Sequence, residues 1–433
     1  MITYISFFLI VLGVLLTLFL GFPGIAFTDS ILQYLDISTN LINEWQSPFM
    51  TWLWKVMESF SPAPLNIFLF QLVLFAGSLY LWWKAFKTHK ELLLGTSLLF
   101  LTPPIFISNA ILWKDTQMVW AFFLAISAYL ISQDSKHKKT FQALSFTSAL
   151  YACSVRYNAA AVLPPLLFFL FKEEGKKGIM KAGFLTLLLF IGSLSLNRFA
   201  SDRKTYPSQT QKGFDLVGIE AHGGRVDYPD FFKTWPAFSV KPIVERYTPD
   251  GLNNLYYSPD RSLRTSYKED VMDDLNDKWM KAILENPMAY LAHKKDVFVT
   301  FLRWDYGSDT YYSFQLESSE NPFGWKVNSL SLSRQMRLFL WPLRNSFFYY
   351  PWIWLIFSFL PLFFYVKKRQ WDLGFFLLLS GYTYLLGFFF VLPASDYRYF
   401  LWTYFTIGLS SVWIVAQNYK HSLARFFPSS TSL

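Results

Sequence analysis

The chain of 433 residues has few residues that could cross-link it, ligate a metal or keep it in water. It contains one cysteine, Cys153, so no intrachain disulfide can form. No His and Cys residues have the spacing of zinc ligands, and there is neither a GxSxG nucleophile motif nor a glycine-rich nucleotide-binding loop. Charged residues make up only 16% of the chain, against about 25% in a typical soluble domain. These absences exclude a disulfide scaffold and argue against a soluble protein.

Apolar and aromatic residues are abundant instead. Hydrophobic residues make up 53% of the chain and aromatic residues 21%, including 47 Phe and 17 Trp. Aromatic rings suit lipid-facing surfaces and the belts at membrane interfaces. A net charge of +9 would favour a nucleic-acid partner in a soluble protein. Here the basic residues form short clusters between apolar runs, so we expect them to mark membrane topology, with no nucleic-acid partner.

The apolar runs are long enough to cross a bilayer, which takes about 20 residues. We predict about ten spans, at residues 2–21, 65–83, 91–108, 116–133, 141–155, 157–171, 180–197, 347–366, 373–392 and 399–416. The expected fold class is an all-α polytopic membrane protein. The apolar segment 48–61 is too short to cross, so we interpret it as a helix lying on the outer surface.

Lys and Arg gather in alternate loops, and this asymmetry indicates the orientation of the chain. The basic clusters fall at 84–90, 136–139, 172–181 and 367–369, with Lys420 and Arg425 near the end. These loops are expected in the cytoplasm together with both termini, because ten is an even number of crossings.

Three regions follow from this pattern. Residues 1–197 form an N-terminal transmembrane core with a first outer loop at 22–64, and residues 347–433 form the C-terminal transmembrane helices and a cytoplasmic tail. Residues 198–346, rich in charge and turn residues, are expected to form one α-rich outer domain between spans seven and eight. Within it we predict helices at 268–281 and 288–304, separated by Pro287.

The outer loops carry ionisable residues that topology does not explain. They are Asp29, Lys114, Asp115, Arg156, Asp396 and Arg398. Charges close to a membrane are costly and usually pair or line a cavity. Arg and Lys bind phosphate oxygens, and a carboxylate can take a proton from a hydroxyl. The set therefore predicts an outward-facing site for transfer from a lipid-linked phosphate donor.

Structural roles are open for several of these residues. Asp29 could cap a helix beginning near Ser30, and Asp115 could cap the fourth span. Asp396 and Arg398 could form an ion pair that serves only the fold. Arg156 is harder to explain structurally, because a lone Arg between two apolar runs needs a partner.

Several short motifs resemble the GT-C superfamily of membrane glycosyltransferases, and a poorly characterised bacterial branch of it in particular. The matching positions are Asp29, Ser30 and Gln33; Trp45 and Pro48; Trp113, Lys114 and Asp115; Arg156 and Asn158; and the DYRY stretch at 396–399. The resemblance covers about the first 170 residues well and the last 90 loosely. Two departures from the family pattern are Ser30, where many members have a second acid, and Gln46-Ser47, where a His usually precedes the proline.

The resemblance implies an inverting transfer of a sugar from a polyprenyl-phosphate donor to an envelope glycan or lipid. The site would face outward from the inner membrane of a bacterium. Asp29 would be the catalytic base, and the substrate-binding candidates are Gln33, Lys114, Asp115, Arg156, Asn158, Asp396 and Arg398. No cofactor is expected, and the missing second acid leaves a divalent metal without support.

Two other classes remain open. O-antigen polymerases and ligases also combine many spans with a large outer loop, but they depend on Arg residues within that loop. A flippase or other transporter should carry polar or helix-breaking residues in mid-membrane, often in two matching halves. The sequence has few such residues and no matching halves.

Overall fold

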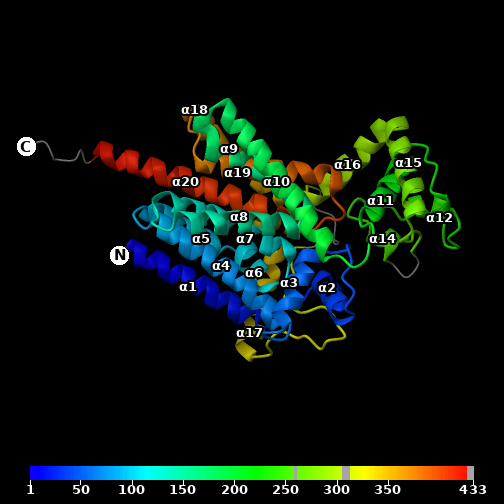
Figure 1. Ribbon diagram of the computed structural model, residues 1–433, viewed down its shortest axis with the longest axis horizontal. Coiled ribbons are helices and arrows are strands. Elements are labelled where there is room, and N and C mark those ends of the chain that lie inside the picture. Colours follow the sequence, from blue (N-terminus) through cyan, green and yellow to red (C-terminus); the bar gives the residue numbers. More distant parts are fainter. Residues whose placement is uncertain (258–260, 305–312, 427–433) are drawn as a thin grey trace, which may run out of the picture.

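The computed structural model describes residues 1–257, 261–304 and 313–426 (Figure 1). Within these residues the protein is helical, and the only β-type pairings are three isolated bridges. The expected all-α membrane fold is confirmed in this respect. The end of the expected cytoplasmic tail, residues 427–433, lies outside the described residues.

Six helical segments are long and apolar enough to cross a membrane. They are α1 (Ile2–Gly21), α4 (Leu65–Phe86), α7 (Lys114–Asp134), α10 (Lys176–Ala200), α19 (Leu373–Val391) and the segment Tyr397–Asn418, which comprises η5 (Tyr397–Phe400) and most of α20 (Leu401–Phe426). A seventh is the pair α5 (Lys90–Phe100) and α6 (Pro103–Ala110), which bends by 58°. Pro103 and Pro104 open α6, and a proline disfavours helical geometry in the residue before it, which accounts for the break.

By length and composition, the described residues therefore contain six or seven spanning segments, fewer than the ten or so that the sequence predicts. The other three predicted spans are helical but short or interrupted. They correspond to α8 (Lys138–Val155), to η1 (Tyr157–Val162) with α9 (Leu163–Phe171), and to α18 (Pro351–Lys368). Arg156 separates α8 from η1 in extended geometry, and α18 contains Pro361.

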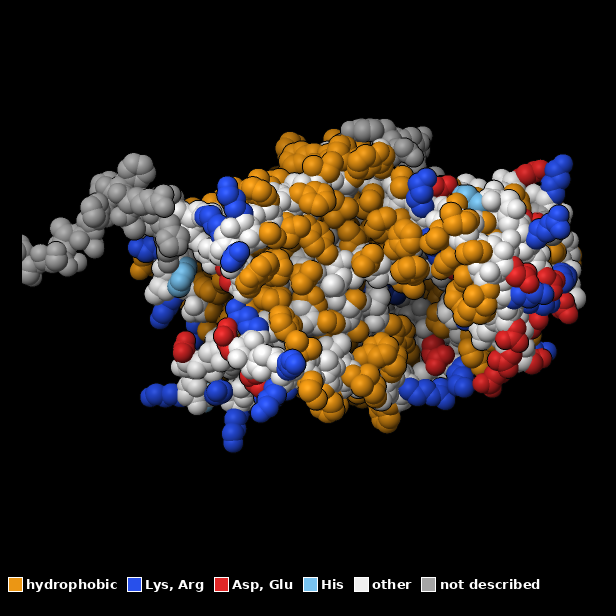
Figure 2. Space-filling view, turned by 90° about the horizontal axis from the view of Figure 1, so that it is seen from above, with side chains coloured by type: hydrophobic (Ala, Val, Ile, Leu, Met, Phe, Trp, Pro, Cys, Tyr) orange, Lys and Arg blue, Asp and Glu red, His pale blue; other side chains and the backbone are white. Residues whose placement is uncertain are grey.

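The type of side chain on the surface changes along the long axis of the protein. Figure 2 shows a broad band of hydrophobic side chains between a mostly basic end and an end where acidic and basic side chains mix. The N-terminus and the far end of α20 lie at the first end, and α11, α12, α14 and α15 lie at the other (Figure 1). An apolar band between two charged ends is the surface of a protein that crosses a bilayer.

The short helix predicted at 48–61, within the first outer loop, is α3 (Pro48–Glu58). The Ser47 side chain caps it by accepting a hydrogen bond of 3.3 Å from the Met50 amide, and Pro48 occupies its first turn. Asn197 near the end of α10 accepts from the Phe49 amide at 3.1 Å. These contacts fix α3 against the end of α10.

Residues 201–301 form a helical body at the end opposite the termini. It contains α11 (Ser208–Ala221), α12 (Asp230–Lys233), α13 (Val240–Glu245), α14 (Asn253–Tyr256), α15 (Glu269–Glu285) and α16 (Pro287–Phe301). The two helices predicted on either side of Pro287 are confirmed as α15 and α16. At the centre, the buried Asp215 carboxylate contacts Lys294 at 2.6 Å and His293 at 3.2 Å, and it accepts from the Trp279 indole at 3.0 Å.

Residues 313–330 contain no helix and lie against the first outer loop; we call them the strap. The strap is followed by α17 (Ser331–Leu340), η3 (Trp341–Asn345) and η4 (Phe347–Tyr349). Its Ser318 hydroxyl accepts from the Ala26 amide at 3.0 Å, and the Ser319 amide donates to the Ala26 carbonyl at 2.9 Å. The Asn328 amide donates to the Phe22 carbonyl at 2.8 Å. The predicted outer segment 198–346 thus divides into a helical body and a strap that holds the first outer loop.

The distribution of basic residues predicts which end of the protein faces the cytoplasm. In a Cys153→Ala background, single cysteines would replace the exposed Lys138 at the basic end and Asp270 on α15. We expect a membrane-impermeant thiol reagent to label position 270 and to spare position 138 in intact spheroplasts, and to label both after permeabilisation. Labelling of position 138 alone in intact spheroplasts would reverse the orientation.

Candidate functional site

The first outer loop is tied to the loop that precedes α7. The Ile25 amide donates to the Ala110 carbonyl at 2.9 Å, and the Leu112 amide donates to the Ile25 carbonyl at 3.0 Å. The buried Gln71 amide holds the same loop through the carbonyls of Asn109 and Ile111, both at 2.9 Å. These contacts bring the start of α2 (Thr28–Ser38) next to the start of α7.

Neither Asp29 nor Asp115 caps its helix. The N-cap of α2 is Phe27, whose amide donates to the Ser30 hydroxyl at 2.8 Å. The N-cap of α7 is Trp113. Both carboxylates face Arg residues instead, so the two capping roles left open by the sequence do not hold.

Five of the predicted residues form one connected ionic cluster. Arg398 approaches Asp29 at 2.5 Å through Nη1 and Asp396 at 2.7 Å through Nε. Arg156 contacts Asp115 at 2.5 Å, and Arg398 lies 4.0 Å from the same carboxylate. Asp115 therefore links the two arginines. We call these five residues the charged cluster.

Members of the charged cluster differ in their access to solvent. The Asp115 side chain is fully buried, and those of Asp396, Arg398 and Arg156 are 7%, 8% and 11% exposed. Asp29 is 28% exposed and is the most open of the five. An external hydroxyl would therefore reach Asp29 before the other carboxylates.

Lys114 and Gln33 both reach the residues before α3. The Lys114 ammonium donates to the Gln46 side chain at 2.7 Å, and the buried Gln33 amide contacts the Ser47 carbonyl at 3.5 Å. Lys114 brings a third positive charge toward Asp29 and Asp115. Within the described part of the chain, the Gln33 side chain makes no hydrogen bond to the charged cluster and lies against the start of α3.

Aromatic rings surround the two guanidinium groups. The Tyr399 ring lies between them, 4.6 Å from Arg156 and 5.2 Å from Arg398. Phe27 lies 5.0 Å from Arg398, and Phe388 lies 5.6 Å from Arg156. Rings at this distance attract cations and also exclude water, which strengthens the charge interactions.

Several polar groups at the site have no hydrogen-bond partner among the described residues. They are the Nε groups of Arg156 and Arg398 and the side-chain amide nitrogen of Asn158. The two Nε atoms are close to carboxylates, but their N–H bonds do not meet hydrogen-bond geometry. The two Nε groups are nevertheless held in ion pairs, so of these three groups only the Asn158 amide nitrogen has donor capacity left for a ligand.

The charge state of Asp29 follows from these neighbours. Burial alone would raise the pKa of Asp29, but the positive charges of Arg398, Lys114 and Arg156 outweigh burial and hold that pKa at about 2. The Asp29–Arg398 ion pair therefore contributes its full stabilisation of the folded state above pH 3.8, the ordinary pKa of Asp. This stabilisation is lost as the pH falls through about 2.

The helical body of residues 201–301 reaches over the loop that carries Asp396. The Ser395 amide donates to the Asp250 carbonyl at 2.7 Å, and the Leu252 amide donates to the Pro393 carbonyl at 3.2 Å. Gly251 has φ +152°, and a Cβ there would lie 3.0 Å from the Ala394 Cα. Only glycine fits this close approach without strain.

Tyr257 extends from the end of α14 toward Asp29. Its side chain interacts electrostatically with Asp29 and receives a hydrogen bond from Trp45. Burial, followed by the negative charge of Asp29, raises the pKa of Tyr257 to about 12. Tyr257, Gln46 and Tyr399 are neighbours of the site that the sequence did not single out as site residues. The DYRY stretch contains Tyr399, and this motif was the available signal.

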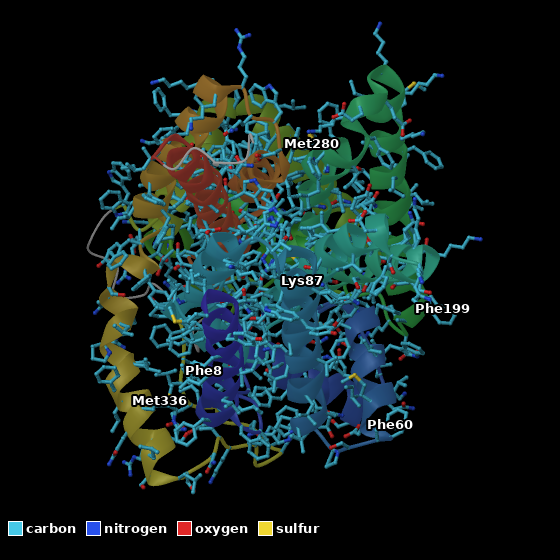
Figure 3. All side chains as sticks on the ribbon, turned by 90° about the vertical axis from the view of Figure 1, so that its left-hand side faces the viewer. Phe8, Phe60, Lys87, Phe199, Met280 and Met336 are labelled. Atoms are coloured by element: carbon cyan, nitrogen blue, oxygen red, sulfur yellow. The ribbon has the colours of Figure 1, made fainter. Side chains whose placement is uncertain are left out.

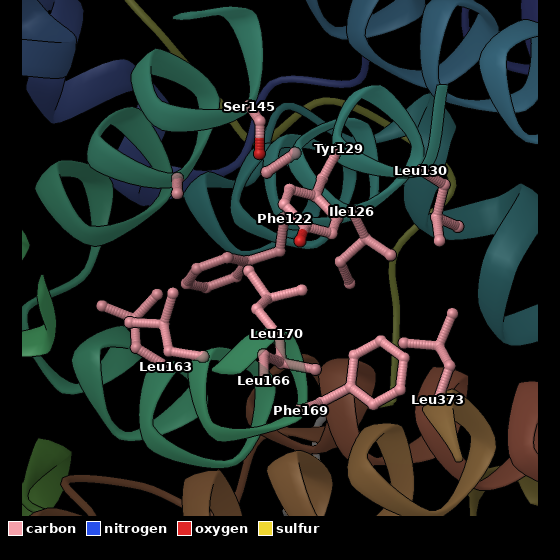
Figure 4. Close-up of a pocket in the computed structure, with 13 residues that line it drawn as sticks. Phe122, Ile126, Tyr129, Leu130, Ser145, Leu163, Leu166, Phe169, Leu170 and Leu373 are labelled. Carbon is pink, nitrogen blue, oxygen red and sulfur yellow. The ribbon is translucent and has the colours of Figure 1, made fainter. Parts of the chain in front are cut away.

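Two hollows of the transmembrane part are apolar. One of about 60 Å³ lies among α7, α8, α9 and α19, where only Tyr129 and Ser145 present hydroxyl groups (Figure 4). Another, of about 540 Å³, is lined by Trp304, Trp352 and Tyr382 among other residues of the α16, α18 and α19 region. Neither contains a member of the charged cluster, so the concentration of charge rather than a hollow marks the candidate site.

Among the described residues, no group of three or more His, Cys, Asp or Glu side chains is arranged to hold a metal ion. Comparisons with protein-family models, with curated proteins and with solved structures give no match.

The charged cluster predicts that Asp115 is important for folding. Asp115→Asn leaves two buried arginines without their shared countercharge, and breaking a buried pair typically costs about 3–5 kcal/mol. We expect a clear fall in thermal stability of the detergent-purified protein. The matched control is Asp273→Asn on the exposed face of α15, which should change stability by no more than about 0.5 kcal/mol. Equal melting temperatures for the two variants would contradict the structural role.

Proposed function

We propose that this protein is a GT-C-like glycosyltransferase of a bacterial inner membrane. It transfers a sugar from a polyprenyl-phosphate donor to an envelope glycan or lipid on the outer face. The observation that supports the proposal best is the charged cluster, in which Asp29, the most accessible carboxylate, stands beside Arg398, with Arg156 joined to the same cluster through Asp115. A phosphate and a reacting hydroxyl need this combination.

The finer topology is part of the proposal. Both ends of the helical part emerge on the same side, so the number of crossings is even (Figure 1). Six apolar helices and the bent pair α5–α6 account for seven crossings. We assign the remaining three to α8, to η1 with α9, and to α18, which gives ten. The basic end then faces the cytoplasm and the charged cluster faces outward.

The basicity of Asp29 is the main chemical question for this mechanism. A carboxylate whose pKa is about 2 is a poor proton acceptor at neutral pH. The negative charge of the donor phosphate competes with Asp29 for Arg398, whose Nη1 faces Asp29 while its Nε faces Asp396. When Arg398 turns to the phosphate, Asp29 loses its nearest cation and becomes a stronger base. Donor binding thus prepares the base for the acceptor.

In the chemical step, the sugar passes from the donor phosphate to the acceptor hydroxyl. The acceptor hydroxyl gives its proton to Asp29 while its oxygen forms a bond to the anomeric carbon of the sugar. The bond between that carbon and the phosphate oxygen breaks, and polyprenyl phosphate leaves with the electron pair. Attack from the face opposite the phosphate inverts the anomeric centre. Arg398, Arg156 and Lys114 stabilise the charge on the leaving phosphate.

The class of reaction can be tested in a strain from which the coding sequence is deleted. Mass spectrometry of its envelope glycans and lipids should show one product lacking a sugar and an accumulated polyprenyl-phosphate sugar. Unchanged glycans together with altered distribution of a lipid-linked sugar between the two leaflets would favour a transporter.

The sharpest prediction concerns Asp29→Asn. Asparagine keeps the size of the side chain but cannot take a proton at neutral pH, so turnover should fall by roughly 10²–10⁴-fold. Protein abundance should stay close to normal, because the asparagine oxygen can still accept a hydrogen bond from Arg398 and because residue 29 does not cap α2. Turnover is measured as sugar transfer in membranes of the deletion strain that express each variant.

The matched control is Asp36→Asn on the same helix. Asp36 accepts a hydrogen bond of 2.7 Å from the Asn43 side chain, and asparagine retains one acceptor oxygen there. We expect a mild effect. Near-normal transfer by Asp29→Asn at normal abundance would refute the catalytic role and would favour the polymerase reading, in which Arg residues of the outer segment carry the reaction.

A further inference from the structure

The helix α17 lies across the direction of the spanning helices. Figure 3 looks along the long axis and shows α17, which carries Met336, side-on. The Ser333 hydroxyl donates to the Phe19 carbonyl at 3.0 Å, close to the end of α1 where the first outer loop begins. In a membrane crossed by α1, this position is the outer interface.

The helix α17 exposes large apolar side chains and buries polar ones. Ser333 and Arg337 are buried together with Leu340, whereas Leu332, Leu338 and Phe339 are 63%, 65% and 80% exposed, beside the exposed Arg334 and Gln335. A soluble helix buries its apolar face and exposes its polar one. An outward apolar face on a helix at the interface fits contact with lipid chains.

The inward Arg337 fixes this orientation. Its guanidinium approaches Glu317 at 2.9 Å, donates to the Ser333 hydroxyl at 2.7 Å and donates to the Asn328 carbonyl at 3.1 Å. Arg337 is thus fully occupied by the protein. The apolar face cannot turn inward without breaking these three contacts.

A polar hollow of about 330 Å³ lies beside α17, between the helix and the strap. Lys326 and Arg334 line it together with the hydroxyl groups of Ser318 and Ser329, and the Glu317 carboxylate at the same hollow is neutralised by Arg337 at 2.9 Å. Both cations are exposed, and neither side chain has an ion-pair or hydrogen-bond partner among the described residues. Two unpaired cations and two hydroxyl groups suit an anionic phosphate group.

We propose that this hollow binds the headgroup of an anionic phospholipid from the outer leaflet, with the acyl chains lying along Leu332, Leu338 and Phe339. The occupant is a lipid rather than a free anion because the cations adjoin an exposed apolar face at the level of the membrane interface. The site is separate from the charged cluster and does not depend on the proposed transfer reaction.

The test uses the full-length protein in detergent and native mass spectrometry. Dioleoylphosphatidylglycerol is added as the probe, and dioleoylphosphatidylcholine serves as the neutral comparison. The protein should retain phosphatidylglycerol preferentially. Lys326→Gln with Arg334→Gln should weaken that retention by roughly 10- to 30-fold, the order expected when two cations near a headgroup are removed.

Two further double variants serve as controls for loss of folding. Lys326→Arg with Arg334→Lys keeps both charges and should retain the lipid. Lys268→Gln with Arg225→Gln removes two exposed cations of the helical body and should leave retention unchanged. Undiminished binding of phosphatidylglycerol by the first double variant would overturn the proposal. So would equal retention of both lipids, or full displacement of phosphatidylglycerol by millimolar inorganic phosphate.

Discussion

The pairing of Asp115 with two arginines is the interaction on which the end of the protein opposite the two termini depends. Taking a charge out of water costs several kcal/mol per ion, and only close opposite charges offset this cost. Arg156 and Arg398 come from regions more than 200 residues apart, yet they share this one buried carboxylate. The breaks in the transmembrane helices make the arrangement feasible, because they allow charged residues to lie at helix ends rather than among lipid chains.

Those breaks also explain much of what the sequence could and could not predict. The chain interrupts its apolar runs at Arg156, at Pro103 and around Asp396. The interruptions at Arg156 and around Asp396 fall in loops that alternate with the basic ones, so the sequence could place the charged residues on a common side, whereas Pro103 lies within the predicted span 91–108. The count by length and composition gives six or seven spans because α8 and α18, with 18 residues each, are less apolar than the counted helices, and because η1 and α9 are two short helices.

Pairing within the site could not be read from the sequence. Which carboxylate contacts which arginine depends on side-chain directions, and Asp29 and Asp115 had equally reasonable roles as caps. Lys114 and Gln33 turned out to lie against residues 46 and 47, a contact that only packing decides. Tyr399 was visible as part of a motif, but its position between two guanidinium groups was not.

The strap of residues 313–330 has a consequence for biogenesis. During synthesis, the loop that carries Ala26 and Asp29 leaves the ribosome almost 300 residues before Ser318, whose hydroxyl accepts the hydrogen bond from the Ala26 amide. The charged cluster likewise lacks Arg398 until the last spanning segment is made. The outer end of the early helices must therefore remain incomplete while the intervening segment crosses the membrane. A ribosome stalled before residue 313 would present an inserted helical core whose first outer loop is still open to proteases.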